Sequence, residues 1–485
     1  MTPTNRIKSA AELAGAKRSY GQNGGGCPWV STPVEIGEFV ELARRLLPEL
    51  SENSPISTGG YVQKAVYPED SILADWMRVA REQEESADSF IIGSILPVCG
   101  AVLGRRVWFE WGEKQKFANR FNVLAGKPGD RKSSIIDLAE MLARRVLPGQ
   151  AFLPKSFSPE TLVDQYCGRP DKLWIVDDAN QVLTDFRKSV NGERVATRLL
   201  DLCDCKSMSE DYRRNKDGKE GGQREIPQTS TNILFGATFN IACFQGQTLR
   251  AGLARRSSYY VAEGPGRLIE RPPRKKDYLG LEALEQGFRE LLGEKIKGPM
   301  DFGARAALLW GKYQRENREE IKQTDLLQEA KLSRLASAPM QTLSLAMIFE
   351  ATRWAKNSNS PPFGAGERWR GVINECTLNF AIEHTKECLK AAEFLDSIAD
   401  KAEIAREAEI LLAHVRRNLD FFRDEKFIFA TRTDLTRSYC KNSGRPGSWK
   451  PEDLYERFIP HLWRRSEACL LKKIGKQEWF AFRAE

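Results

Sequence analysis

The 485-residue chain has little histidine, and its cysteines are not spaced like the ligands of a metal site. His384, His414 and His461 are its three histidines, and its ten cysteines include no C-x-x-C pair. Structural zinc sites need four such ligands, usually as closely spaced pairs, so the sequence argues against zinc. Only Cys203 and Cys205 lie close together. We therefore expect reduced, mostly buried thiols, as in a cytosolic protein.

The sequence also lacks a hydrophobic run long enough to cross a membrane. Its most apolar stretch, residues 90–103, is interrupted by Pro97 and Gly100. That stretch is shorter than the roughly 20 residues that a membrane span requires. Residues 1–16 contain no apolar segment of the kind found in a secretory signal peptide. We expect a cytoplasmic protein with no membrane partner.

Composition gives a broad class but no function. Hydrophobic residues make up 41% of the chain and charged residues 29%, which is ordinary for a soluble globular protein. The length suggests about three domains. The net charge of +8 is small for this length, so the distribution of charge carries more information than its total.

Residues 121–136, FNVLAGKPGDRKSSII, organise the chain. A short apolar strand leads into a glycine-bearing loop, and a helical pattern follows. Backbone N–H groups and a helix N-terminus converge on an anion in such a place, and a lysine and a hydroxyl can then bind the phosphates and Mg²⁺ of ATP. The candidate ligands are Gly126, Pro128, Gly129, Arg131, Lys132, Ser133 and Ser134.

One residue departs from the phosphate-loop template G-x-x-x-x-G-K-[ST]. Arg131 stands where the second glycine belongs, and its Cβ restricts the backbone. Gly129 can take the strained turn, and Arg131 adds positive charge near the phosphates. The pattern is also compatible with an ordinary strand, turn and helix.

Two further buried strands are predicted to end in polar residues. Residues 173–176 lead into Asp177 and Asp178, of which the first would hold Mg²⁺ and the second would activate water. Residues 232–240 end in Thr238 and Asn240, and Asn240 is placed to hold that water against the γ-phosphate. A capped core strand and a turn-forming asparagine are the simpler interpretations.

Arg255 and Arg256 follow these strands, and either can act as an arginine finger in a neighbouring subunit. Taken alone, the pair is better explained as a solvated basic patch.

The order of these motifs resembles the AAA+ ring ATPases, and in particular the superfamily-three helicases of viruses and plasmids. Residues 89–112, SFIIGSILPVCGAVLGRRVWFEWG, followed by NVLAGKPGDRKSS, are similar to a family of P-loop proteins on phages, plasmids and integrated elements. Members of that family are often fused to primase-polymerase domains. The resemblance implies an α/β P-loop ATPase that hydrolyses ATP between the subunits of a homo-oligomeric ring and acts on single-stranded or forked DNA. It also implies a primase or polymerase as a further partner.

A hairpin is predicted between the acidic and the polar-tipped strands. Residues 205–228 carry six basic and five acidic side chains, with glycines at their centre. In superfamily-three helicases the hairpin at this point grips DNA in the pore, which here implies contacts from Tyr212, Arg213, Arg214 and Arg224. A solvated loop explains the nearly balanced charge equally well.

Four domains follow from the pattern: a helical N-terminal region (1–110), a P-loop core (111–265), a helical lid (266–400) and a winged-helix unit (401–485). The first has a flexible start and helices at 35–46 and 71–84. The last is predicted from helix, strand, two helices and two strands. Between 430 and 480, eleven Lys and Arg stand against six Asp and Glu, which favours DNA binding over a protein-binding winged helix. The candidate DNA ligands there are Arg464, Arg465, Lys472, Lys473 and Lys476.

Two functions are compatible with the sequence. The first is an ATP-driven DNA motor, such as the replicative helicase of a mobile genetic element, which translocates on or unwinds DNA. The second is a nucleotide-binding DNA adaptor or replication initiator with little hydrolysis, in which Arg131 and Asp178 slow the reaction. Turnover stimulated by DNA separates the two.

Overall fold

The computed structural model describes residues 62–188, 190–211, 223–226, 228–239, 252–264, 266–270, 279–293, 296–325, 328–357, 371–418, 427–436, 454–464, 468–474 and 477–483. By their contacts, the described residues belong to two compact units, Ser57–Ala399 and Asp400–Glu485. The fold is mixed α/β with parallel sheets, as the sequence predicts at this coarse level. The predicted flexible start and the predicted helix at 35–46 lie outside the described residues.

A four-stranded parallel sheet with the strand order β4-β7-β3-β8 forms the centre of the larger unit. Its strands are β3 (Phe121–Gly126), β4 (Asp171–Val176), β7 (Ser230–Thr238) and β8 (Ser257–Val261). Strand β3 pairs with β7 on one side and with β8 on the other. Because all four strands run in the same direction, their carboxyl ends meet at one edge, where open α/β sheets bind ligands.

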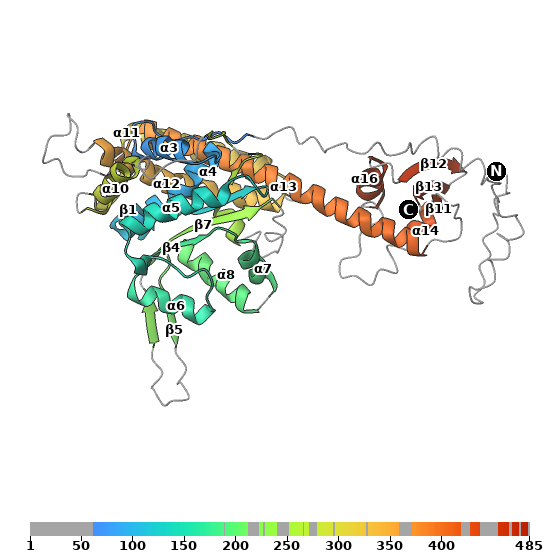
Figure 1. Ribbon diagram of the computed structural model, residues 1–485, viewed down its shortest axis with the longest axis horizontal. Coiled ribbons are helices and arrows are strands. Elements are labelled where there is room, and N and C mark those ends of the chain that lie inside the picture. Colours follow the sequence, from blue (N-terminus) through green and yellow to red (C-terminus); the bar gives the residue numbers. More distant parts are fainter. Residues whose placement is uncertain are drawn as a thin grey trace, which may run out of the picture. The chain divides into compact units, whose positions relative to one another are not determined.

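Both faces of this sheet are covered by helices, which explains why β3 is buried throughout (Figure 1). On one face, Leu124 belongs to a core with α4 (Asp88–Leu103) and α5 (Lys132–Val146). On the other, Phe121 and Val123 pack into a second core. That core contains side chains of α6 (Pro159–Gly168), α7 (Asn180–Lys188) and α8 (Val190–Cys203).

Helix α4 is the apolar stretch of the sequence, and it is continuous through Pro97. The expectation that no run is long enough to cross a membrane is wrong in length, because residues Asp88–Arg106 are long and apolar enough; however, 89% of the relevant window is buried inside the protein. Polar contacts also fix α4 to the sheet: Ser89 Oγ donates to Val261 O at 3.0 Å, and Asn122 Nδ2 donates to Gly93 O at 2.7 Å. Such burial is typical of the core helix of a soluble protein.

A second, smaller sheet has the order β10-β9-β1-β2. Its strands are β1 (Val107–Trp111), β2 (Lys114–Phe117), β9 (Gly298–Phe302) and β10 (Val372–Ile373). Of these four strands, the sequence predicts only β1, from the alternating pattern of residues 106–111. Strands β9 and β10 lie in the region predicted as a helical lid, and the prediction misses both strands. Gly298 and Pro299 interrupt the helical pattern, but a strand this short is held by pairing with β1, which is distant in sequence.

The remaining helices of this unit are α3 (Ile72–Gln83), α10 (Leu279–Leu292), α11 (Ala304–Gln323), α12 (Glu329–Asn357) and the first part of α13 (Glu375–Asn418). Short helical turns are η2 (Gly104–Arg106), η3 (Gly149–Ala151) and α9 (Ala254–Arg256). The predicted helix at 71–84 is confirmed by α3.

Helix α12 meets the sheet at its amino edge. Gln341 Nε2 donates to Arg255 O at 2.7 Å, and Ser344 Oγ donates to Asn119 O at 2.7 Å. Both acceptors precede strands, Arg255 before β8 and Asn119 before β3. These contacts lie at the end of the sheet opposite the glycine-bearing loop. Helix α12 is therefore anchored at the amino edge of the sheet through Gln341 and Ser344.

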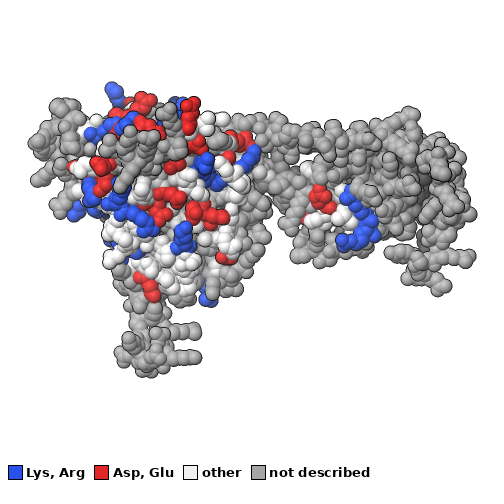
Figure 2. Space-filling view, viewed as in Figure 1, with Lys and Arg blue, Asp and Glu red and all other residues white. Residues whose placement is uncertain are grey.

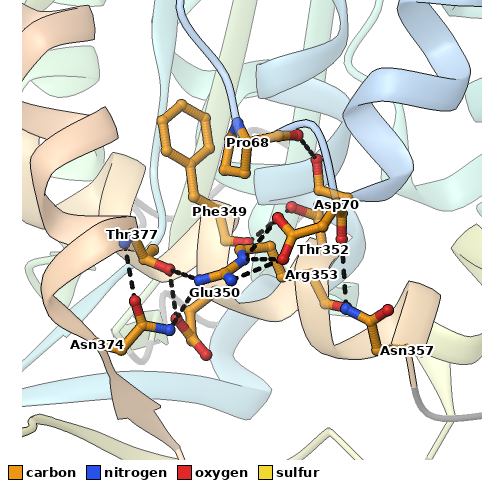
Figure 3. Close-up of polar contacts among 10 residues, drawn as sticks. Pro68, Asp70, Phe349, Glu350, Thr352, Arg353, Asn357, Asn374 and Thr377 are labelled. Carbon is orange, nitrogen blue, oxygen red and sulfur yellow. Dashed lines mark hydrogen bonds and ion pairs between the residues drawn. The ribbon is translucent and has the colours of Figure 1, made fainter. Parts of the chain in front are cut away.

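A polar network fixes the segment before α3 to the helical layer (Figure 3). The Arg353 guanidinium donates to both carboxylate oxygens of Asp70, at 2.6–3.0 Å, and to Thr377 Oγ1 at 2.6 Å. The Thr377 hydroxyl in turn donates to Glu350 Oε2 at 2.6 Å. The hydrogen bond from Arg353 lowers the pKa of Asp70, whereas burial raises the pKa of Glu350. One arginine thus joins α12, the start of α13 and the chain entering α3.

The smaller unit contains a three-stranded antiparallel sheet with the order β11-β13-β12. Its strands are β11 (Phe427–Thr431), β12 (Ala468–Ile474) and β13 (Gln477–Arg483). Its helical elements are the end of α13, α14 (Arg432–Leu435), η8 (Leu454–Phe458) and α16 (Ile459–Arg464). Leu411, Ile428, Phe458 and Phe482 belong to one buried core. The order of helices and strands is the one predicted from the sequence.

Candidate functional site

The glycine-bearing loop joins the carboxyl end of β3 to the start of α5. Asp130 closes it, because the Lys127 N–H donates to Asp130 Oδ2 at 2.5 Å and the Asp130 N–H donates to Lys127 O at 3.3 Å. Asp130 is buried, whereas Lys127, Pro128 and Gly129 are exposed. Gly129 has φ 94°, a conformation that glycine adopts without steric cost. The loop therefore presents an exposed turn directly before a helix N-terminus.

Lys132 folds back into this loop. Its ammonium donates to Gly126 O at 2.9 Å and to Lys127 O at 2.7 Å. Burial lowers the pKa of Lys132, and the carboxylates of Asp130 and Asp178 act in the opposite direction. A positive charge held by backbone carbonyls at the start of a helix is well placed to meet an anion.

Arg131 takes the conformation that the missing template glycine would take. It is the N-cap of α5 with φ 58° and ψ 29°, in the left-handed region. This conformation costs a non-glycine residue roughly 1–2 kcal/mol. Its guanidinium lies 3.0 Å from Glu85 Oε2. The positive charge of Arg131, which the sequence predicts to lie near bound phosphates, thus forms an ion pair with the Glu85 carboxylate.

Ser133 and Ser134 lie in the first turn of α5, where Ser133 is exposed and Ser134 half-buried. Within the residues that the structure describes, no three His, Cys, Asp or Glu side chains gather as a metal site. The residues present nevertheless fit Mg²⁺ bound with a nucleotide. Mg²⁺ usually takes one or two protein oxygens and completes its shell with phosphate and water. Ser133 and Asp177 offer such oxygens.

The tips of β4 and β7 are held together beside the loop. The Ala179 N–H donates to Gly236 O at 2.8 Å, and Asn180 Oδ1 accepts from the N–H and the hydroxyl of Thr238 at 3.4 and 3.5 Å. A Cβ on Gly236 would lie 2.3 Å from Asp177 O, so the close approach of the strands requires glycine. Asp177 and Thr238 therefore share the carboxyl edge, as the sequence predicts for parallel strands.

Asp177 pairs with a residue that no motif identifies. Lys155 Nζ lies 3.1 Å from Asp177 Oδ1, and this hydrogen bond lowers the pKa of Asp177. On α5, burial and the charges of Asp177 and Glu140 raise the pKa of Asp137. Lys155 thus holds a positive charge among carboxylates near the loop. Its loop position, with no motif around it, gives no signal in the sequence.

Asp178 is exposed and caps a helix. Its Oδ1 accepts from the Asn180 N–H at 3.2 Å at the start of α7. Its carboxylate is nevertheless close enough to influence the pKa of Lys132. The Asp178 side chain is therefore compatible with both interpretations: an acidic helix cap, and a group that activates water.

The two adjacent arginines have different environments. The Arg256 guanidinium bonds both carboxylate oxygens of Asp204, with Nε at 2.7 Å from Oδ1, and also donates to Gly252 O at 3.0 Å. Its side chain is only 14% exposed, so Arg256 holds the fold and is not available as an arginine finger. The half-buried Arg255 side chain makes no hydrogen bond or ion pair with another described residue. Arg255 alone remains a candidate finger.

The predicted DNA contacts are only partly described. Strands β5 (Met208–Asp211) and β6 (Gln223–Ile226) pair antiparallel, which confirms the predicted hairpin and places Arg224 on β6. Arg464 ends α16, and Lys472 and Lys473 lie on β12 beside a bulge. The other candidate site residues lie outside the described residues: Tyr212, Arg213, Arg214, Asn240, Arg465 and Lys476.

Comparison of the chain with protein-family models and with curated proteins finds no match. The geometry of the site therefore carries the functional argument.

Proposed function

We propose that this protein binds ATP with Mg²⁺ at the carboxyl edge of the β4-β7-β3-β8 sheet and hydrolyses it as a DNA motor. The observation that carries the proposal is Lys132, whose ammonium lies inside a closed loop between a buried strand and a helix. Asp178 is near enough to influence the pKa of Lys132, and Asp177 directly follows β4 of the same sheet. A lysine and two carboxylates around one loop are what phosphoryl transfer requires.

Each residue has a stated role in this proposal. Lys132 exchanges its carbonyl partners for phosphate oxygens, to which an ammonium binds more strongly because both groups are charged. Ser133 and Asp177 hold the metal, which neutralises charge on the phosphates when it is bound. Asp178 orients or deprotonates the attacking water. Asn240, outside the described residues, is proposed to hold that water against the γ-phosphate.

The proposed nucleic-acid partner is DNA, bound through the hairpin and the smaller unit. The order of helices and strands in the smaller unit, with its three-stranded antiparallel sheet, supports a winged-helix domain. On the face of the larger unit that Figure 2 shows, Lys and Arg are interspersed with Asp and Glu. The excess of Lys and Arg between 430 and 480 is therefore the stronger indication of phosphate binding.

The resemblance to superfamily-three helicases supports a ring-shaped homo-oligomer that serves replication of a mobile element, beside a primase or polymerase. Arg255 precedes β8, at the edge of the sheet opposite the phosphate loop. An arginine at that edge cannot serve the loop of its own sheet. In the proposed ring it serves the site of a neighbouring subunit.

A second candidate function is a nucleotide-binding DNA adaptor or initiator with little hydrolysis. Two observations favour it: Asp178 is engaged as a helix cap, and Arg131 is in a strained conformation. Either would misplace the groups that activate water while leaving Lys132 able to bind phosphate.

ATP turnover with and without single-stranded DNA separates these functions. A motor predicts turnover that DNA stimulates and that Lys132→Ala abolishes in a folded protein. Arg255→Ala should also be inactive, and mixing it with Lys132→Ala should restore activity, because one subunit supplies the arginine and the other the loop. Nucleotide binding without turnover would support the adaptor. Unchanged turnover in folded Lys132→Ala protein would contradict both.

A further inference from the structure

Glu85, in the short connection between α3 and α4, contacts two distant parts of the chain. Its Oε2 lies 3.0 Å from the Arg131 guanidinium at the end of the phosphate loop. Its Oε1 accepts from the Ile269 N–H at 3.1 Å, and its carbonyl accepts from the Gly266 N–H at 2.8 Å. Gly266 and Ile269 belong to residues 263–264 and 266–270, here named the post-β8 segment. One residue therefore holds both the loop and this segment.

The same connection supports the strained backbone of Arg131. Ser86 is 1% exposed, and its hydroxyl donates to Arg131 O at 2.7 Å. A non-glycine residue keeps a left-handed conformation only where its surroundings enforce it, and such positions cluster at functional sites. Glu85 binds the Arg131 guanidinium and Ser86 binds the Arg131 carbonyl oxygen, so the two residues together hold Arg131 in this conformation.

A second contact joins the loop to the post-β8 segment. Lys127 Nζ lies 3.9 Å from Glu263 Oε1, and the Glu263 side chain is only 9% exposed. Lys127 and Arg131 are the positive side chains on either side of the loop turn. Lys127 thus faces Glu263, which belongs to the post-β8 segment, and Arg131 faces Glu85, which accepts a hydrogen bond from that segment. The Arg131 side chain remains 55% exposed, so a ligand at the loop can reach it.

We propose that Arg131 and Glu85 form a latch that couples polyphosphate binding at the loop to release of the post-β8 segment. The inference rests on the proposed function, because it needs an anion at the loop. A guanidinium binds phosphate in the same bidentate manner as carboxylate, so a polyphosphate competes with Glu85 for Arg131. The ligand's negative charge also repels the Glu85 carboxylate. Movement of Glu85 breaks its bond to the Ile269 N–H.

Hydrogen exchange of the post-β8 segment tests the latch, with Mg·ADP as the ligand and its binding measured separately by calorimetry. In the unaltered protein, we expect ADP to speed exchange at Ile269 by about tenfold or more, since a hydrogen bond to a charged group is broken. Glu85→Ala should exchange as fast without ADP as with it. Arg131→Gly suits the left-handed conformation and should fold, and it should bind ADP more weakly because the guanidinium is lost, but at saturating ADP the exchange at Ile269 should no longer respond.

Glu82→Gln on α3 is the matched control, because Glu82 forms an exposed pair with Arg78 and no contact with the loop. It should respond to ADP like the unaltered protein, and Arg131→Lys should keep part of the response. A full response in Arg131→Gly would overturn the latch, as would ADP binding with no change at Ile269. Absence of ADP binding would overturn the nucleotide site itself and the latch with it, and calorimetry identifies that case.

Discussion

Replacing Arg256 by methionine should destabilise the larger unit, whereas the same change at Arg255 should not. Arg256 makes two bonds to Asp204 and one to Gly252 O, and its side chain is 14% exposed. Methionine keeps much of the volume but removes all three bonds. Arg255 has no such partner among the described residues, so it provides a control of the same residue type at the adjacent position.

The magnitude follows from the carboxylate left behind. Removing one partner of a fully buried ion pair costs about 3–5 kcal/mol. The Asp204 side chain is 33% exposed, so water recovers part of that cost and we expect about 2–3 kcal/mol. For a unit of this size, the loss corresponds to a decrease in Tm of roughly 3–5 °C. Arg255→Met should change stability by less than about 0.5 kcal/mol.

The pH dependence of this loss has a definite sign. Burial would raise the pKa of Asp204, but the hydrogen bond and charge of Arg256 outweigh it and lower the pKa. A carboxylate with a lowered pKa stabilises the fold above its unfolded pKa of about 3.9, and this contribution disappears as the pH falls through the folded value. The difference between the unaltered protein and Arg256→Met should therefore be complete at pH 7 and shrink below about pH 4.

Urea unfolding and thermal melts of both variants measure these differences. Adding Asp204→Leu to Arg256→Met should recover part of the stability, because no unpaired carboxylate remains. Equal stability of Arg255→Met and Arg256→Met would refute the assignment of Arg256 to the fold, as would a penalty that persists unchanged at about pH 3.

Three further predictions concern other parts of the chain. Gly236→Ala should displace Asp177 and lower the Tm in a thermal melt, because the new Cβ would lie 2.3 Å from Asp177 O. An unchanged Tm would contradict the close approach of these strands. Arg353→Met should lower the free energy of unfolding by about 2 kcal/mol, measured in urea, because it breaks the network of Figure 3. A decrease of less than about 0.5 kcal/mol, the size expected for an ordinary surface substitution, would contradict a stabilising role for the network. Replacing Lys472 and Lys473 by Gln should lower the log–log salt slope of duplex DNA binding by about 0.9 for each phosphate that is no longer bound, and an unchanged slope would exclude both from the interface.

The sequence predicts those parts of the site that depend on local pattern. Strand β3, the loop and α5 follow from residues 121–136, and the tips of β4 and β7 meet because parallel strands share an edge. The predictions are weaker where the structure depends on distant contacts. Strand β9 is held by β1; its Gly298 and Pro299 interrupt the helical pattern, but its five residues have no pattern that identifies a strand.

Side-chain partners are equally hard to predict from the sequence. Arg255 and Arg256 are identical in type and adjacent, yet only Arg256 reaches Asp204, 52 residues earlier in the chain. Lys155 and Glu85 belong to no motif, and they become part of the site only because the fold brings them beside Asp177 and Arg131. Tertiary packing, rather than local propensity, decides which charges belong to the site.

Calorimetric titration of Mg·ATP into the unaltered protein and into Lys132→Ala tests the central claim most directly. Loss of the ammonium removes charge-assisted bonds worth about 1.5–3 kcal/mol each, so binding should weaken roughly 10- to 100-fold. Lys322→Ala, at an exposed pair with Glu319 on α11, removes the same charge elsewhere and should bind as the unaltered protein does. Equal affinity of the unaltered protein and a folded Lys132→Ala variant would contradict the assignment of this loop as the nucleotide site.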